Sequence, residues 1–279
     1  MRIITDSASD ITQEEALKYN IDVIPLSVSF NGVAYKDGVD ITKVEFYNKL
    51  IESPEIPKTS MISSFIFEEY FDKYKDEEII YIGLSSKLSN SYNQALIAAK
   101  EKNNVYTVDS LNVAMGQRVL VEYAIRLRDK NIEAKEIVKL LNDNKGCIEV
   151  IALLDTLDYL QKGGRISKTV AFAGKILTIK PVIGVKNGKV ELIGKARGSK
   201  NGNNLLRELI TTTGGIDFDM PYSLGYSGVS KFLLENYINN NKDLYNGDIS
   251  IIPISMIGPT IGTHVGPNAI GVAFFSKTE

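Results

Sequence analysis

The chain of 279 residues contains one histidine, one cysteine and no tryptophan. A single cysteine excludes an internal disulfide, and one histidine with one cysteine falls short of the ligand set of a structural zinc site. Cys147 stands just before the apolar run 150–154, where we expect it to pack rather than to react. We therefore expect no metal and no cofactor.

The chain also lacks an excess of charge of either sign. It has 32 Lys and Arg against 34 Asp and Glu, a formal net charge of −2 and no basic stripe, so nucleic acid is not an expected partner. No apolar run is long enough to span a bilayer, and residues 1–6 are typical of a strand rather than of a signal peptide. We expect a cytoplasmic protein without a transmembrane segment, which leaves room for transient contact with a membrane.

In the first half of the chain, predicted apolar strands alternate with predicted amphipathic helices. The patterns Thr12-x-x-Glu15 and Thr42-x-x-Glu45 are capping boxes that predict helix starts, and Asn31-Gly32 predicts a hairpin. Strands are predicted at 3–5, 23–30, 79–84 and 105–108. This alternation is typical of a doubly wound parallel sheet, an α/β arrangement.

The second half differs because it contains a hairpin between long strands. Asn187-Gly188 separates the predicted strands 183–185 and 190–193, and further strands are predicted at 150–154, 222–226, 249–254 and 269–275. The length of the chain favours two domains. We expect an N-terminal Rossmann-like α/β domain, residues 1–148, and a smaller C-terminal α/β domain with a mixed sheet, residues 149–279.

The only histidine stands in the run Gly262-Thr263-His264-Val265-Gly266-Pro267. Glycine lets a backbone approach a ligand and proline stiffens it, so we expect the His264 ring on a rigid loop before a buried strand. A site protein presents a polar group in this way. A structural histidine that bonds to loop backbone fits the same pattern.

Hydroxyl groups follow the predicted strand 79–84, in the run Ser85-Ser86-Lys87-Leu88-Ser89-Asn90. Ligands bind at the carboxyl ends of parallel strands, and a helix N-terminus favours an anion there. Simple capping by Ser89 explains the same run. Thr59 and Ser60, in the predicted loop 57–60, either cap the next helix or face the same crevice. For Asp6, at the end of the first strand, a structural role is the main interpretation and a catalytic role the alternative.

Two basic segments are further candidates for the site, and several common enzyme motifs are absent from the sequence. Arg165 follows a glycine pair and can neutralise an anion or a carboxylate. The predicted loop 195–200, with Arg197, is either solvated or a docking patch for an acidic partner or a phosphate. A Walker A loop, a nucleophile elbow and H-E-x-x-H are all missing. Hydroxyls without a recognisable base favour binding over turnover.

Together these runs resemble the DegV family of bacterial fatty-acid-binding proteins. The matching runs are Thr5-Asp6-Ser7, Thr59-Ser60, Ser85-Ser86-x-Leu88-Ser89, Val108-Asp109-Ser110, Leu160-x-Lys162-Gly163-Gly164-Arg165-Ile166 and Gly262-Thr263-His264-Val265-Gly266-Pro267. The resemblance implies a two-domain DegV-like fold with a long-chain fatty acid, C14–C18, in an apolar tunnel. Its carboxylate is expected in the interdomain cleft, and segments 170–179 and 269–275 are expected as tunnel walls.

The resemblance also implies residue roles. The residues expected to bind the carboxylate are Thr59, Ser60, Ser89, Asn90 and His264, with Asp6, Arg165 and Thr263 in support. Asn90 stands where the family usually has glycine, and Met61-Ile62 where it usually has Gln-Pro, which reshapes the site without removing a hydroxyl.

The implied function is that of a carrier similar to the fatty-acid-binding subunits called FakB, not of an enzyme. Such a protein presents its acid to a fatty acid kinase, which makes acyl phosphate for phospholipid synthesis. We expect Arg197 to belong to a docking surface for that kinase. The alternative is an acyl or phosphoryl transferase or hydrolase that uses Ser89 and His264.

Overall fold

The parallel sheet predicted for the first half is present, with four strands, in a computed structural model that describes residues 1–167, 179–245 and 250–277. Its strands are β1 (Arg2–Asp6), β2 (Ile21–Ile24), β6 (Ile79–Gly83) and β7 (Val105–Asp109), in the order β2-β1-β6-β7. All three pairings are parallel, and every residue of β6 is buried. Such burial is typical of a sheet covered on both faces.

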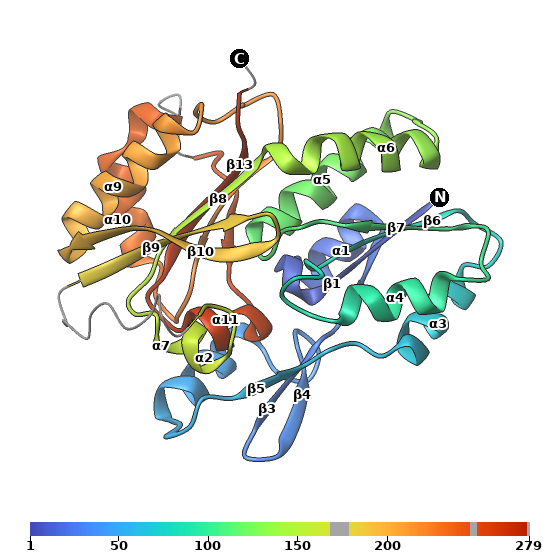
Figure 1. Cartoon of the computed structure of the whole chain (residues 1–279), viewed down its shortest axis with the longest axis horizontal. Helices are drawn as coiled ribbons and strands as arrows, with labels where there is room; N and C mark the ends of the chain where they lie inside the picture. The colour runs from blue at the N-terminus through green and yellow to red at the C-terminus, as the bar shows by residue number, and fades with distance from the viewer. Residues whose placement is uncertain (168–178, 246–249, 278–279) are drawn as a thin grey trace.

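Helices from the first half cover this sheet. They are α1 (Gln13–Tyr19), α3 (Ser64–Lys73), α4 (Ser91–Ala99), α5 (Met115–Asp129) and α6 (Ala134–Asn144). Helices α3 and α4 pack together on one side, and α5 and α6 lie on the other (Figure 1). The doubly wound α/β prediction is confirmed.

The second half builds a six-stranded mixed sheet, also as predicted. Its strands are β8 (Ile148–Leu153), β9 (Ile179–Lys186), β10 (Lys189–Arg197), β11 (Tyr222–Tyr226), β12 (Ile254–Met256) and β13 (Ile270–Phe275). The order is β10-β9-β8-β13-β11-β12, with only β11 and β12 parallel. Helices α9 (Gly198–Thr212) and α10 (Phe232–Asn240) lie beside it, and α5 also contacts it (Figure 1). The division into residues 1–148 and 149–279 stays a prediction.

A third, three-stranded sheet corrects two predictions. It consists of β3 (Ser27–Phe30), β4 (Val33–Lys36) and β5 (Lys58–Ser60), in the order β4-β3-β5. The predicted strand 23–30 is therefore two strands in different sheets, because the chain leaves the parallel sheet after Ile24. The predicted loop 57–60 contains a strand because residues 58–60 pair antiparallel with β3. Three residues are too few to give a periodic signal.

Capping boxes and hairpin turns were predicted correctly. The hydroxyls of Thr12 and Thr42 each accept from the backbone N–H three residues later, and the glutamates there close both boxes. In both hairpin turns, Asn31-Gly32 and Asn187-Gly188, the asparagine and the glycine have positive φ. That is the geometry that favours this dipeptide in a two-residue hairpin.

Three other predicted segments differ from the structure. His264 lies on a short helix, α11 (Pro259–Val265), not on a loop, because Pro259 fits the first helical turn and Gly266 ends it with φ of 71°. The predicted loop 195–200 is the junction of β10 and α9, where Gly198 supplies a φ of 74°. Of the predicted strand 249–254, residue 249 lies outside the described residues. Only Ile254 belongs to a strand.

Helix α11 is held at its N-terminus by two buried carboxylates. Asp10 accepts from the backbone N–H of Gly258 at 2.7 Å, and Asp37 accepts from that of Thr260 at 2.9 Å. Both carboxylates are almost fully buried. They satisfy donors that a helix start leaves unpaired.

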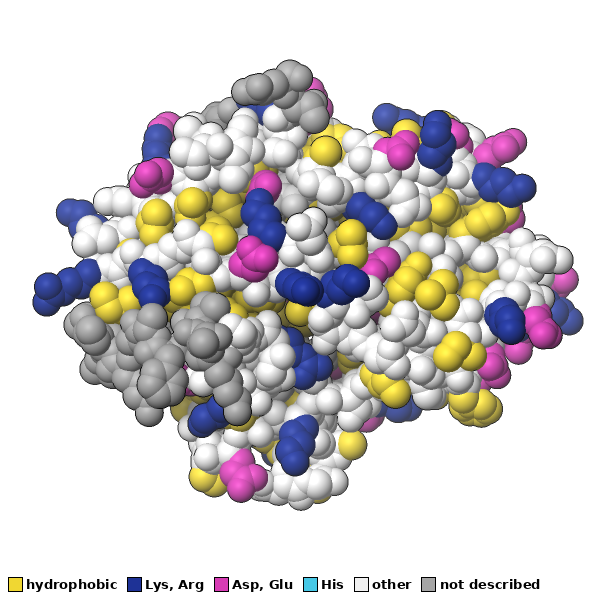
Figure 2. Space-filling model, viewed as in Figure 1, with side chains coloured by type: hydrophobic (Ala, Val, Ile, Leu, Met, Phe, Trp, Pro, Cys, Tyr) yellow, Lys and Arg dark blue, Asp and Glu magenta, His cyan; other side chains and the backbone are white. Residues whose placement is uncertain are grey.

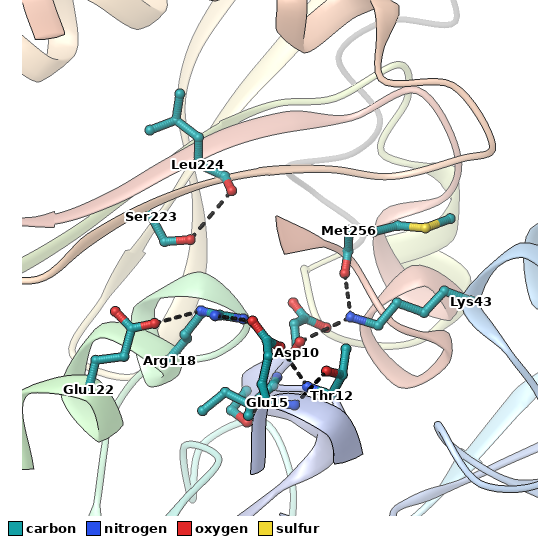
Figure 3. A network of polar contacts seen from close by, with 11 residues as sticks. Asp10, Thr12, Glu15, Lys43, Arg118, Glu122, Ser223, Leu224 and Met256 are labelled. Atoms are coloured by element: carbon teal, nitrogen blue, oxygen red, sulfur yellow. Dashed lines mark hydrogen bonds and ion pairs between the residues drawn. The ribbon is translucent and has the colours of Figure 1, made fainter. Parts of the chain in front are cut away.

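One lysine ties this junction together. Lys43, the first residue of α2 (Lys43–Glu52), donates to the carbonyl oxygens of Asp10 and Met256 (Figure 3). A neighbouring ion-pair network joins Arg118 of α5 to Glu15 of α1 and to Glu122. These polar contacts link α2 to the backbone at Asp10 and Met256, and α5 to α1.

The surface carries no large field of one sign on the face shown in Figure 2, where Lys and Arg side chains alternate with Asp and Glu. Of the helices that the structure describes, none combines the length and the apolar character that crossing a bilayer requires.

A pH dependence of stability follows from the Asp10 carboxylate. Burial raises its pKa from 3.8 to about 7, although Lys43 and the Gly258 N–H act in the opposite direction. The folded chain thus holds a proton that the unfolded chain has released. The contribution to stability is full below about pH 4 and is lost as the pH rises through 7. Between pH 5 and 8 we expect the wild type to lose about 2–3 kcal/mol more than Asp10→Asn.

The measurement is urea unfolding of both proteins at pH 5 and pH 8. Asparagine keeps an acceptor for the Gly258 N–H, so Asp10→Asn is expected to remain folded. Asp76→Asn, at an exposed position, serves as the control that should follow the wild type. Equal losses of stability in wild type and Asp10→Asn would contradict the prediction.

Candidate functional site

A cavity of about 300 Å³ lies among the carboxyl end of β6, the six-stranded sheet and α11. Most of its lining is apolar, and alternate residues of single strands contribute, as expected when one face of a sheet forms a wall. Strand β8 and the residue after it supply Val150, Ala152 and Leu154, and β9 supplies Ile183 and Val185.

Part of one predicted tunnel wall does line the cavity. Ala269, Ile270 and Gly271 of segment 269–275 line the cavity. Of the other predicted wall, residues 170–178 lie outside the described residues.

Polar side chains gather at one part of this lining. The residues expected at the carboxylate, Thr59, Ser60, Ser89, Asn90 and His264, all line the cavity, and so does Arg165. They come from β5, from the turn before α4, from α11 and from the turn after α7 (Asp158–Lys162). The fold therefore brings together segments that are about 200 positions apart.

The centre of this polar group is a contact between Thr59 and His264. Thr59 Oγ1 lies 3.0 Å from His264 Nε2. Burial, and then the positive charge of Arg165, lower the pKa of the ring from 6.5 to about 4. His264 is therefore neutral at physiological pH, with one N–H and one acceptor nitrogen.

The other ring nitrogen, Nδ1, has no hydrogen-bond partner among the described residues. The ring lies against Gly163, where a Cβ would overlap Nδ1. Gly163 has an ordinary φ of −73°, so glycine is needed here for space. Gly164 has φ of 72° and is needed for backbone conformation. The two glycines before Arg165 thus have different physical roles.

Arg165 is fixed beside the polar group by backbone acceptors. Its Nη1 donates to the carbonyl oxygen of Gly163 at 2.6 Å, and its Nε donates to that of Leu88 at 3.2 Å. Burial lowers the pKa of the guanidinium, which nevertheless remains charged. A positive charge is thus held at the end of an apolar cavity, where it suits an anion.

Ser89 bonds locally and faces the same cavity. Its Oγ accepts from the backbone N–H of Ser91 and lies 3.0 Å from Ser91 Oγ. The residue at the N-cap position of α4 is Asn90, not Ser89, and Asn90 makes no side-chain cap bond. The capping interpretation of Ser89 is therefore wrong by one position, although its hydroxyl does meet the first turn.

Three predicted residues do not line the cavity. Asp6 is fully buried and accepts from the backbone of Ala8 and Leu84 and from two side chains, so it holds the turn that follows β6. Thr263 donates within α11 to Pro259. Arg197 is exposed at the start of α9.

One positioning contact has no signal in the sequence. The hydroxyl of Ser85 donates to the carbonyl oxygen of Gly188 at 2.8 Å, which ties the β9–β10 hairpin to the turn after β6. A hairpin sequence indicates its own turn but not what the turn touches. No group of three or more His, Cys, Asp or Glu in the described ranges could hold a metal ion.

Known proteins resemble this chain along its whole length. A family model described as "Uncharacterised protein, DegV family" matches residues 1–277. A DegV domain-containing protein of Caldanaerobacter subterraneus subsp. tengcongensis is 36% identical over 281 residues, which cover 99% of this chain and 98% of the relative.

Two solved structures share the fold. A DegV family protein from Thermus thermophilus, described by its fatty acid binding, has a TM-score of 0.88 and 26% identity, and the match covers 99% of each chain. A Thermotoga maritima protein described as revealing a fatty acid binding function has a TM-score of 0.83 and 28% identity, over 98% of this chain and 97% of the other. With a family model over nearly all its residues and a relative above 30% identity, the protein belongs to the DegV family.

Proposed function

We propose that this protein binds a long-chain fatty acid, C14–C18, with its acyl chain in the apolar cavity. The carboxylate meets Thr59, Ser89 and His264, with the charge of Arg165 nearby. The observation that carries this proposal is a cavity with apolar walls and one group of hydroxyls, a neutral imidazole and a guanidinium. The acid lies between two domains, residues 1–148 and 149–279.

Energetics support an acyl ligand. Each buried methylene contributes about 0.8 kcal/mol, so a C16 chain gains roughly 11 kcal/mol before the loss of freedom is subtracted. A carboxylate buried without donors would cost several kcal/mol. The polar residues of the cavity offset that cost, which explains why they lie together.

The tautomer of His264 decides what Thr59 offers to the ligand. If Nε2 carries the ring proton and donates to Thr59 Oγ1, the hydroxyl hydrogen of Thr59 is free to be donated to a carboxylate. In this arrangement the histidine acts by orienting the threonine. Fatty acid binding in the Thermus and Thermotoga relatives supports a fatty acid as the ligand.

We further propose that the protein is a carrier that presents its acid to a fatty acid kinase, which forms the acyl phosphate used in phospholipid synthesis. A presenting protein needs an exposed docking residue away from its ligand. Arg197 meets that condition, because it is exposed and lies outside the cavity lining.

The geometry argues against the alternative of a transferase or hydrolase that uses Ser89 and His264. The hydrogen bonds of the Ser89 hydroxyl go to Ser91, whereas His264 contacts Thr59. A ring whose pKa is about 4 is a weak general base at neutral pH. The described residues also offer no carboxylate to orient Nδ1.

The experiment that tests the proposal is mass spectrometry of the organic extract of denatured, purified protein. We expect a fatty acid of C14–C18 in about equimolar amount. A protein that carries no acid and also does not take up palmitate or oleate would overturn the proposed function.

Removing the Ser89 hydroxyl should weaken binding. A hydrogen bond to a charged group contributes about 1–2 kcal/mol, so Ser89→Ala is expected to raise the Kd for palmitate roughly five- to thirtyfold. Titration calorimetry on delipidated protein measures the change. Ser86→Ala, in the same turn but outside the cavity lining, is the matched control and should bind as wild type. Equal Kd values for wild type and Ser89→Ala would move the carboxylate elsewhere.

Reversing the charge at Arg197 should impair presentation. We expect Arg197→Glu to lower acyl-phosphate formation by a fatty acid kinase roughly tenfold, because charge at an interface governs association. Its palmitate Kd should stay unchanged. Lys100→Glu, also exposed, carries the same charge change at a distant helix end and serves as the control. Unaltered kinase turnover with Arg197→Glu would exclude this docking residue.

A further inference from the structure

Two glycines face each other in the six-stranded sheet at the floor of the cavity. Gly225 of β11 and Gly271 of β13 are directly opposite in the antiparallel ladder, and both line the cavity. Neither residue has a positive φ. Their backbone conformation therefore does not require glycine. Glycine is needed at both positions because a side chain would occupy space that another group fills.

The space above this glycine pair is filled by Met115. A Cβ at Gly225 would overlap Met115 Sδ, and a Cβ at Gly271 would lie 2.9 Å from Met115 Cε. Met115 is 4% exposed and lines the cavity. Its thioether thus lies in a depression that two side-chain-free positions create.

The backbone that carries Met115 is fixed. Met115 is the first residue of α5, and the preceding Ala114 donates its N–H to the carbonyl oxygen of Ala8 at 2.8 Å. The next residue, Gly116, lies so close to the sheet that a Cβ there would be 2.5 Å from Val150 Cγ2. Only the side chain of Met115 is left free to change position.

One more small residue lies beside the glycine pair, and a large one follows it. Gly271 pairs with Ala152 of β8, and Ala152 pairs with Ile183 of β9. All of them line the cavity. The part of the sheet without large side chains is therefore at β11, β13 and Ala152 of β8, and Met115 lies over its β11 and β13 positions.

We propose that Met115, seated on the Gly225–Gly271 pair, is the residue that sets how long an acyl chain the cavity accepts. The terminal methyl group of the acid meets the thioether. The polar residues hold the carboxylate, so the distance from them to Met115 limits the number of methylenes that can be buried. This inference rests on the proposed fatty acid binding.

The chemistry of methionine suits this position. Its side chain is unbranched and has several rotatable bonds, so it fills irregular gaps and adapts to what lies beside it. Each further methylene that the cavity can bury strengthens binding by about fourfold. Truncating Met115 removes about three heavy atoms and opens the depression above the glycine pair.

The test measures Kd for a series of saturated acids from C12 to C20, by displacement of a fluorescent fatty acid from delipidated full-length protein. In the wild type we expect Kd to fall about fourfold per carbon up to a limiting length. Met115→Ala should move that limit up by about two carbons. Gly271→Ala should move it down by about one carbon, because the new methyl group pushes Met115 Cε toward the ligand.

The double variant Met115→Ala, Gly271→Ala tests whether the effect of Gly271→Ala depends on Met115. If Gly271 acts through Met115, the Gly271→Ala change lowers the limit less in the Met115→Ala background than in the wild type, because the new methyl group then has no thioether to displace. Met220→Ala removes a half-buried methionine outside the cavity lining and should keep the wild-type limit. Melting temperatures show which variants are folded, and Met115→Leu, with a smaller expected shift in the same direction, replaces Met115→Ala if that variant unfolds.

The outcomes separate the two proposals. A limiting length that is the same in wild type, Met115→Ala (or Met115→Leu) and Gly271→Ala overturns the role of Met115 and leaves fatty acid binding intact. A wild type that binds no acid of the series overturns the proposed function itself.

Discussion

Two buried carboxylates hold the N-terminus of α11, and the position of His264 depends on them. Asp10 and Asp37 come from loops of the first half of the chain, whereas α11 comes from the second half. Because a helix start presents unpaired N–H groups, acceptors at this point fix both the place and the direction of the helix. The ring of His264, between one and two turns further along, is thereby aimed at Thr59.

The same arrangement accounts for the chemical character of the site. His264 is packed against Gly163 and lies near the positive charge of Arg165, so it stays neutral. A neutral ring with one neighbouring hydroxyl can orient a hydrogen bond. With its low pKa it is a poor general base for a catalytic cycle. The proposed binding of a fatty acid uses the first property and not the second.

Local signals in the sequence predicted local structure well. The capping boxes at Thr12 and Thr42 and the Asn-Gly turns were correct because their causes lie within a few residues. The strand predicted across 23–30 was wrong because an apolar run does not show at which residue the chain changes sheets. The loop expected around His264 was wrong because glycine and proline also fit the ends of a short helix.

The candidate site was predicted from a resemblance of motifs, because none of its residues belongs to a pattern that identifies a chemistry by itself. In the sequence alone, the hydroxyls of Thr59 and Ser89 fit either helix capping or ligand binding. Met115 and the glycine pair were not predicted at all. Their relation exists only across strands that are far apart in the sequence, and Gly225 and Gly271 resemble any other glycine in a strand.

The cavity is lined by residues that range from Leu26 to Gly271, so it exists only when nearly the whole chain is folded. Any molecule that fills it binds the native state alone, and its binding free energy adds to the free energy of unfolding. The filled and the empty protein then differ in how often they unfold. Resistance to heat and to proteolysis therefore reports whether the cavity is filled.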